Sequence, residues 1–342
     1  MQTEPCKPGM RKFMRRLLGR LSQVKWLRPF CQDIMVLWRG GWIDSELPFP
    51  QVSDMPAVVM TVAHEEACYA AIRYARRYDL PLVTFFHDWW PDLAEVHASF
   101  RSMLERSFRE LYDYSSLALC ISEGMKKELG PHANSRVLLP MPAEPEAETS
   151  PSVNNEGSPF KLIYAGNLVG YGAMLMKALD VLKGHPHIRL EVRGNSSSWP
   201  DAVVSEMSEL GLLLPFVPRQ ELTEWLESAD GFLVTQSFDE GEQRLMSTNF
   251  PSKLSEFAQF GKPLILWGPA KATGPQWARN TRQGLVVDEE NPDQLRIALE
   301  RLCGDEDERL RLSSAACSAA TGEFDPELIQ SQFRKYLSEI IS

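Results

Sequence analysis

The stretch NFPSKLSEFAQFGKPLILWG, residues 249–268, reads as a turn, a short helix, a glycine and then an apolar strand. Pro251 suits the start of a helix, because the first backbone N–H groups of a helix have no intrahelical partner and proline lacks that group. Lys253 and Glu256 follow in the first turns, where the free N–H groups and the positive end of the helix dipole favour an anion. A surface helix that buries its apolar side chains fits the same residue types, so an anion site and a simple packing helix both stay open.

Short apolar runs alternate with helical stretches on both sides of this segment. Strands are expected at 33–38, 57–62, 81–87, 116–121, 136–140, 161–166, 188–194, 212–217, 231–236, 263–268 and 284–287. Near-continuous apolar strands separated by helices are typical of parallel sheets that are covered on both faces. The sequence therefore predicts the α/β class, with two Rossmann-like parallel-sheet domains facing across a cleft, where ligands bind beyond the carboxyl ends of the strands.

Length and composition divide the chain into parts. With 342 residues it is too long for one ordinary core and suits two domains. We expect an N-terminal domain over 1–140, a linker over 141–160 and a C-terminal domain over 161–342, because the middle segment is rich in Pro, Glu, Ser and Asn and has little to bury. The last helix is a candidate to pack back on the first domain.

Charge and cysteine content argue against some classes of function and indicate a cellular location. A net charge of -10 and a sequence pI near 5.3 argue against a nucleic-acid partner. The 6 cysteines include no CxxC pair and several lie in apolar runs, which favours reduced thiols in a cytoplasmic protein. No apolar run is long enough for a membrane span, and the N-terminus lacks a signal-peptide pattern, so we expect a cytoplasmic location.

One segment, residues 7–30, departs from the acidic average. It places apolar side chains at helical spacing with basic residues between them: Met10, Phe13, Met14, Leu17, Leu18, Leu21 and Val24 against Lys12, Arg15, Arg16, Arg20, Lys25 and Arg28. Basic amphipathic helices of this kind lie on anionic bilayers. An ordinary first helix packed on the sheet fits as well, so a peripheral position on the inner face of a membrane is one of two interpretations.

A glycine-rich turn, AGNLVGYGAM at 165–174, follows an expected strand and precedes an expected helix. That context exposes backbone N–H groups, which can bind a phosphate. A tight strand-to-helix turn without a ligand explains the same glycines. The sequence contains neither the G-x-x-x-x-G-K-[ST] phosphate loop nor the G-x-G-x-x-G dinucleotide fingerprint.

These two stretches resemble the donor domain of the GT-B glycosyltransferases, of the retaining type called glycosyl transferases group 1. Glu256, Gly261 and Pro263 follow the order of the family's C-terminal signature. The similar stretches are PSKLSEFAQFGKPLIL (251–266), LIYAGNL (162–168), FVPRQELTEWLESADGFLV (216–234), PLVTFFHDWWPDL (81–93) and LALCISEGMKKEL (117–129). The last two resemble strands and helices of the family's acceptor domain, so the likeness extends over most of the chain.

The resemblance implies a site for a nucleotide-sugar donor. Its candidate binding residues are Gly166 and Asn167 for the phosphate, Val217 and Pro218 for the base, Pro251, Ser252 and Lys253 for the diphosphate, and Glu256 for the ribose. Cations and helix N–H groups would stabilise the leaving diphosphate by electrostatic preorganisation, without a bound metal.

The catalytic candidates are His87, Arg193 and Lys253. His87 ends an acceptor-domain strand and would contact the sugar or the acceptor, with Asp88 as a weaker alternative for acceptor deprotonation. Arg193, before Gly194 at a strand end, would be a second cation. A structural histidine and a surface arginine fit the same positions.

The implied enzyme is hexosyltransferase-like. It would move a sugar, with UDP or GDP as the nucleotide, to a saccharide or lipid-linked saccharide, as in polysaccharide biosynthesis, with retention and no cofactor. Two departures support an alternative. Thr248 stands eight residues before Glu256, where many members have a sugar-contacting glutamate, and no cation follows the 165–174 turn until Lys177. A catalytically silent GT-B scaffold that binds a nucleotide sugar or a partner enzyme therefore stays open, as does an epimerase of the same architecture.

Overall fold

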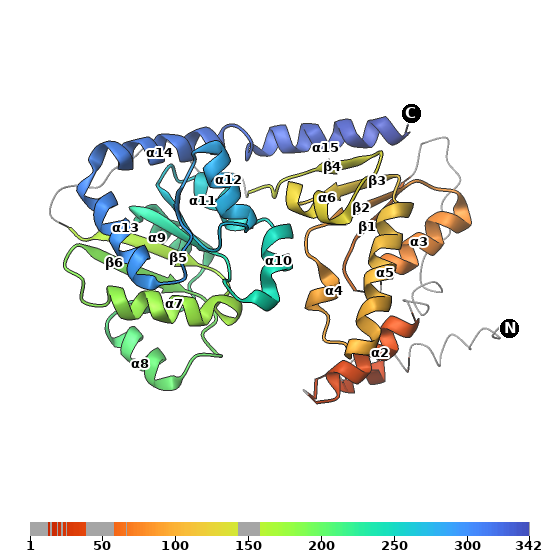
Figure 1. The fold of residues 1–342 in the computed structure, drawn as a ribbon, viewed down its shortest axis with the longest axis horizontal. Coiled ribbons are helices and arrows are strands. Elements are labelled where there is room, and N and C mark those ends of the chain that lie inside the picture. Colours follow the sequence, from red (N-terminus) through yellow and green to blue (C-terminus); the bar gives the residue numbers. More distant parts are fainter. Residues whose placement is uncertain are drawn as a thin grey trace. The chain divides into compact units, whose positions relative to one another are not determined.

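The computed structural model describes residues 13, 16–18, 20–21, 23–24, 26–38, 58–65, 67–142 and 158–341. Two compact units make up the chain, residues 1–138 with 332–342 and residues 139–331. Each unit contains its own parallel sheet (Figure 1). The expected linker over 141–160 lies mostly outside the described residues, as does the first part of the expected helix over 7–30.

The first unit contains a four-stranded sheet in the order β1-β2-β3-β4, with every neighbouring pair parallel. Its strands are β1 (Val59–Val62), β2 (Leu82–Phe86), β3 (Leu117–Cys120) and β4 (Ser135–Val137). Its helices are α2 (Arg28–Trp38), α3 (Ala67–Tyr78), α4 (Trp90–Leu93), α5 (Ala98–Tyr114) and α6 (Glu123–Leu129). The strands coincide with expected apolar runs, and the intervening helices return the chain for parallel pairing.

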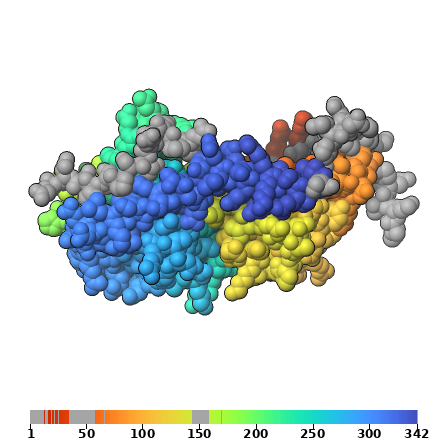
Figure 2. All heavy atoms as spheres, turned by 90° about the horizontal axis from the view of Figure 1, so that it is seen from above, coloured from red at the N-terminus to blue at the C-terminus, as the bar shows by residue number. Residues whose placement is uncertain are grey.

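The two faces of this sheet bury different partners, because successive side chains of a strand point to opposite faces. On one face Phe86 packs edge-on against Phe108 and Tyr112 of α5, with ring centroids 5.3 and 5.5 Å apart. On the other face a cluster around Val83 and Leu117 is covered by side chains of α15 (Pro326–Ile341), namely Phe333, Tyr336, Leu337 and Ile340. Figure 2 shows this C-terminal helix in dark blue against the yellow part of the unit, which includes β3 and β4.

The expected strand over 33–38 is wrong, because these residues form the second half of α2. Their apolar run fits a buried strand and a buried helix equally well when it is read alone. Pro29, just after the helix begins, favours a helical first turn. Asp33 is buried, and its carboxylate accepts hydrogen bonds from the backbone N–H of His97 at 3.0 Å and from the His97 ring, which ties α2 to the start of α5.

The second unit contains a six-stranded parallel sheet in the order β10-β9-β8-β5-β6-β7. Its strands are β5 (Phe160–Ala165), β6 (Ile188–Arg193), β7 (Leu213–Leu214), β8 (Gly231–Thr235), β9 (Leu264–Trp267) and β10 (Leu285–Val287). The helical elements are α7 (Leu168–Leu182), α8 (Asp201–Glu209), α9 (Arg219–Glu227), the 3-10 turn η1 (Glu240–Glu242), α10 (Gln243–Thr248), α11 (Ser252–Ala258), α12 (Thr273–Thr281), α13 (Pro292–Gly304) and α14 (Glu306–Ala320). The expected strand over 212–217 is shorter than predicted, because Pro215 has no N–H with which to continue the ladder.

The core of the second unit lies on both faces of its sheet. Leu162, Leu190, Leu233 and Ile265, one from each of four adjacent strands, are at most 1% exposed. The predicted fold class is confirmed: the chain is α/β, with two Rossmann-like parallel sheets. The five described cysteines are free thiols. Within the described part of the chain, no helix is both long and apolar enough to cross a bilayer.

Candidate functional site

The order of strands in the second unit selects one position at the carboxyl edge of its sheet. From β5 the chain adds β6 and then β7 on one side, and it then crosses over to add β8, β9 and β10 on the other side. The direction of winding therefore reverses between β5 and β8. Open α/β sheets bind ligands outside the carboxyl ends of the strands at such a switch point.

The two strands separate at this point. Backbone pairing between β5 and β8 covers only Leu162 with Gly231 and Ile163 with Phe232, although the strands continue to Ala165 and Thr235. Beyond these two pairs no ladder pairing joins β5 to β8 in the described structure, and we call this unpaired carboxyl end of the two strands the crevice.

Tyr164 lies under this crevice and supports the turn that follows β5. The side chain is 5% exposed, and its hydroxyl donates a hydrogen bond to the backbone oxygen of Asn167 at 2.9 Å. Burial raises the pKa of the Tyr164 phenol, so it stays protonated and remains a donor. The sequence prediction did not include Tyr164, although its position two residues before Gly166 at a strand end could have suggested it.

The Gly166 turn and Lys253 lie together. A Cβ atom at Gly166 would be 3.7 Å from Cε of Lys253 and 3.4 Å from the hydroxyl oxygen of Tyr164. The backbone N–H of Gly166 donates to the carbonyl of Arg193 at 3.1 Å, which fixes the turn against the end of β6. Two stretches almost ninety residues apart in sequence thus meet at the carboxyl ends of β5 and β8.

Helix α11 presents Lys253 and Glu256 on its exposed side. The ammonium nitrogen of Lys253 lies 2.7 Å from Oε2 of Glu256, and the two side chains are 37% and 43% exposed. On the opposite side of the helix Phe257 stacks on Phe232 of β8, with ring centroids 4.4 Å apart and planes at 13°. Pro251 is the N-cap of this short helix and makes no side-chain cap, so Lys253 adds a full positive charge beside backbone N–H groups that no side chain caps.

Gly194 makes the approach of the turn possible, which leads to a stability prediction. A Cβ atom there would lie 2.3 Å from the carbonyl oxygen of Gly166 and 2.5 Å from Cγ of Leu168. We expect Gly194→Ala to displace the turn and to lower the free energy of unfolding by about 1–2 kcal/mol, as overpacking does. Urea titration measures the loss. Gly304→Ala is the matched control, since a Cβ at Gly304 meets nothing within 4 Å, and equal stability of the two variants would contradict the prediction.

The structure favours the structural interpretation of Arg193. Its guanidinium donates to the backbone oxygen of Pro215 and stacks over the ring of Trp225, 4.6 Å from the centroid. The Trp225 indole in turn donates to Glu191 at 2.7 Å. Burial lowers the pKa of Arg193. The guanidinium is thus engaged in a stack that holds the loop after β7, rather than being presented as a second catalytic cation.

The loop after β7 carries the residues expected to border a base. Val217 is half-buried, and Pro218 is exposed and caps α9. Their neighbour Phe216 is 77% exposed, which is unusual for a phenylalanine. The sequence prediction did not single out Phe216, although an aromatic residue between two prolines was a usable signal.

Thr248 is enclosed by its own helix. Its side chain has no exposed surface, and its hydroxyl donates to the backbone oxygen of Arg244 at 2.8 Å. The position where the family resemblance suggests a sugar-contacting glutamate is therefore a buried helix end in this chain.

His87 lies at the carboxyl end of β2 in the first unit. Its Nε2 is 3.1 Å from a carboxylate oxygen of Asp88, and its ring centroid is 5.9 Å from that of His64, which follows β1. Nδ1 of His64 is buried without a hydrogen-bond partner. Because adjacent parallel strands end at the same edge, His64 could have been predicted as a neighbour of His87.

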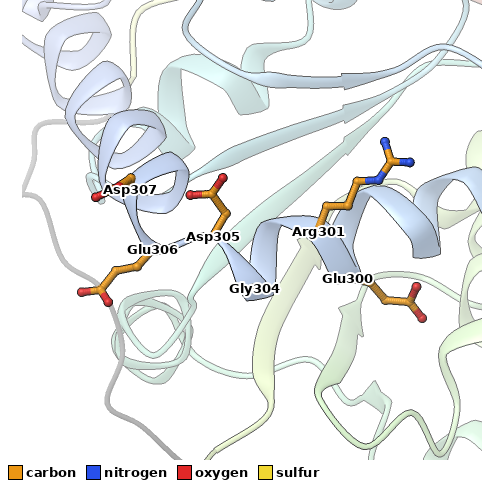
Figure 3. Close-up of a pocket in the computed structure, with 6 residues that line it drawn as sticks. All are labelled: Glu300, Arg301, Gly304, Asp305, Glu306 and Asp307. Atoms are coloured by element: carbon orange, nitrogen blue, oxygen red, sulfur yellow. The ribbon is translucent and has the colours of Figure 1, made fainter.

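A hollow at the junction of α13 and α14 is not part of this site. Figure 3 shows its lining, which is mostly acidic: Glu300, Arg301, Gly304, Asp305, Glu306 and Asp307. Asp305 caps α14 by accepting from the backbone N–H of Glu308 at 2.9 Å, and acidic residues are favourable in a first helical turn. Glu300 bonds His185, just before β6 begins, so the hollow lies at the amino edge of the sheet, opposite the crevice.

Several solved structures align with this chain, whereas searches by sequence find no match. No protein-family model and no curated protein matches the sequence. Among solved structures, Anabaena HepE in complex with UDP-glucose aligns with a TM-score of 0.60 at 18% identity, over 82% of this chain and 79% of that chain. A glycosyltransferase from Rickettsia africae aligns with a TM-score of 0.59 at 14% identity, over 92% and 82%. Sucrose-phosphate synthase from Thermosynechococcus elongatus aligns with 0.58 at 12%, over 82% and 73%. These likenesses show a shared two-domain fold.

Proposed function

We propose that this protein is a glycosyltransferase that moves a hexose-like sugar from a nucleotide-sugar donor to a saccharide or lipid-linked saccharide, with retention and without a metal. One observation carries the proposal: Lys253 and Glu256 lie beside the Gly166 turn, where β5 and β8 diverge. The likeness to HepE, whose structures contain UDP and UDP-glucose, makes UDP the first nucleotide to test and GDP the second. Polysaccharide biosynthesis is the process that such a reaction would serve.

Each candidate site residue has a role in this proposal. The ammonium of Lys253 neutralises the charge that develops on the leaving diphosphate. Gly166 has no side chain, so a phosphate can approach the backbone of the turn. Glu256 accepts hydrogen bonds from the ribose hydroxyls, and Val217 borders the base. His87 is assigned to the acceptor or the transferred sugar, because Thr248 leaves that sugar without the glutamate that many members of the resembled family use.

The Lys253–Glu256 ion pair must rearrange when a donor binds. In the structure Nζ of Lys253 and Oε2 of Glu256 lie 2.7 Å apart and satisfy each other. Lys253 would turn to the diphosphate and Glu256 to the ribose. The partial exposure of both side chains keeps the cost of separating them low, since exposed pairs contribute about 0–1 kcal/mol.

We therefore expect Glu256→Ala to weaken UDP binding about tenfold, or ~1.4 kcal/mol, because a charged ribose contact is lost. Binding of pyrophosphate, which has no ribose, should not weaken, since Lys253 is then free of its partner. Isothermal titration calorimetry with UDP, GDP, ADP and pyrophosphate measures both effects.

The matched control is Glu290→Ala, which removes another exposed glutamate paired with a lysine, Lys177, at 3.1 Å. It should leave all four affinities unchanged. If Glu256→Ala weakens UDP and pyrophosphate alike, Glu256 does not bind the ribose. If the folded wild-type protein binds none of the nucleotides, the silent scaffold replaces the transferase as the better interpretation.

A further inference from the structure

The N-terminal segment carries a surface that the proposed reaction does not use. Large apolar side chains are exposed along the described part of residues 13–30, and we call this set the N-terminal patch: Phe13, Leu17, Leu21, Val24, Trp26 and Phe30. Trp26 is 78% exposed, Phe13 64% and Phe30 57%. Single exposed apolar residues are ordinary, whereas a concentration of them marks an interaction site.

Three of the helical residues described in this segment turn apolar side chains outward. Phe13, Leu17 and Leu21 are spaced four apart and are helical, so they share one face. Leu18, on another face, is 3% exposed and points into the protein. An amphipathic helix of a globular domain normally turns its apolar stripe to the core, so the outward stripe needs a partner.

Basic residues flank the patch. Arg16 and Arg20 are exposed and precede Leu17 and Leu21 directly, so they lie along the edge of the apolar stripe. The first 30 residues contain eight lysines and arginines and one glutamate, although the whole chain has a net charge of -10. The positive charge is therefore concentrated next to the exposed apolar side chains.

The C-terminal end of the N-terminal patch, at Phe30, is attached to the folded part of the first unit. Phe30 lies in α2, next to the fully buried Cys31. Arg28 pairs with Glu95 at 3.1 Å, and Asp33 holds the start of α5. These contacts tie the part of the patch at Phe30 to the folded first unit.

We propose that the N-terminal patch docks on an anionic lipid bilayer. Trp and Phe side chains suit the interfacial region of a bilayer, and arginines beside them pair with lipid phosphates. A second copy of the chain would bring the same arginines against one another across a two-fold axis, so like charges oppose that partner. The inference is independent of the donor chemistry, because it uses none of the residues around Lys253.

Vesicle co-sedimentation of the full chain tests the proposal. The wild type is expected to bind vesicles of phosphatidylcholine with phosphatidylglycerol, to bind pure phosphatidylcholine weakly, and to lose binding as salt is raised. Phe13→Ser with Leu17→Ser removes apolar contact, and Arg16→Glu with Arg20→Glu reverses charge. Each pair should weaken partitioning to anionic vesicles at least about tenfold, because the first removes apolar area buried in the interface and the second reverses the attraction of basic residues to anionic lipid.

Matched controls lie elsewhere on the chain. Leu328→Ser changes another exposed leucine, and Arg301→Glu reverses another exposed arginine, and both should bind vesicles as the wild type does. Absence of binding to anionic vesicles overturns the proposal, as does binding that both patch variants leave unchanged. Self-association that the patch variants abolish, without vesicle binding, would assign the surface to a second copy instead. Titrating UDP into the same variants measures the proposed donor site, so a failure of membrane docking can be told apart from a failure of nucleotide binding.

Discussion

Replacing Lys253 by alanine is expected to weaken UDP binding by up to about a hundredfold, since a charge-assisted hydrogen bond contributes about 1.5–3 kcal/mol. Cε of Lys253 would lie 3.7 Å from a Cβ at Gly166, which places the ammonium at the mouth of the crevice between β5 and β8. The short α11 has no side-chain cap, so no side chain competes with a ligand for the backbone N–H groups at its start. Calorimetric titration of UDP into the variant measures the loss, and pyrophosphate should lose affinity in parallel because the same charge binds both ligands.

Two variants make the Lys253 experiment selective. Lys177→Ala removes an exposed lysine that is also paired with a glutamate, Glu290, and it should leave UDP binding unchanged. Lys253→Arg keeps the charge and should recover part of the affinity, although a guanidinium fits a different geometry. If the Lys253 and Lys177 alanine variants bind UDP equally well, Lys253 does not hold the diphosphate.

The largest expected loss of stability follows from Phe257→Ala. Phe257 is 1% exposed and stacks at 4.4 Å on Phe232, which has no exposed surface. Truncating a buried phenylalanine leaves a cavity and costs about 3–5 kcal/mol. Urea titration followed by circular dichroism measures this decrease. Because Phe257 follows Glu256 directly, the variant should also bind UDP more weakly under conditions in which it is still folded.

Two further variants serve as controls for the stability loss of Phe257→Ala, namely Phe257→Leu and Phe216→Ala. The leucine variant refills part of the cavity and should recover most of the stability. Phe216 is a phenylalanine of the same unit with 77% of its surface exposed, so its truncation should change stability little. Equal losses from Phe216→Ala and Phe257→Ala would show that the stack with Phe232 does not anchor α11.

The sequence was sufficient for the sheets but not for every element. Apolar runs between helical stretches are long and unambiguous in the second unit, where all six expected strands form. The apolar run at 33–38 was wrongly predicted as a strand, because a short apolar run carries no periodicity that separates a helix from a strand. Its neighbours decide the outcome: Pro29 begins the helix, and Cys31 and Asp33 turn into the core.

For the candidate site, too, the sequence is informative where the signal is local and uninformative where it depends on residues that are distant in the chain. Gly166, Lys253 and Glu256 could be chosen as candidates because each belongs to a local pattern of strand, turn and helix start. Arg193 could not be interpreted from its position alone, since its partners Pro215 and Trp225 are distant in sequence. The place of Tyr164 near a strand end was visible in the sequence, but its role depends on where pairing between β5 and β8 ends, which the sequence does not show.

The early end of pairing between β5 and β8 leaves a seam through the six-stranded sheet. Two register pairs join β5 to β8, whereas six join β5 to β6. Native-state hydrogen exchange commonly reports cooperative units bounded by such weak backbone connections. We therefore expect the β10-β9-β8 and β5-β6-β7 halves to open as separate cooperative units in hydrogen exchange. A diphosphate held by Lys253 on one half and the Gly166 turn on the other would link their openings. Amide protons of both halves would then be protected by the same ligand, although it touches only a few of them.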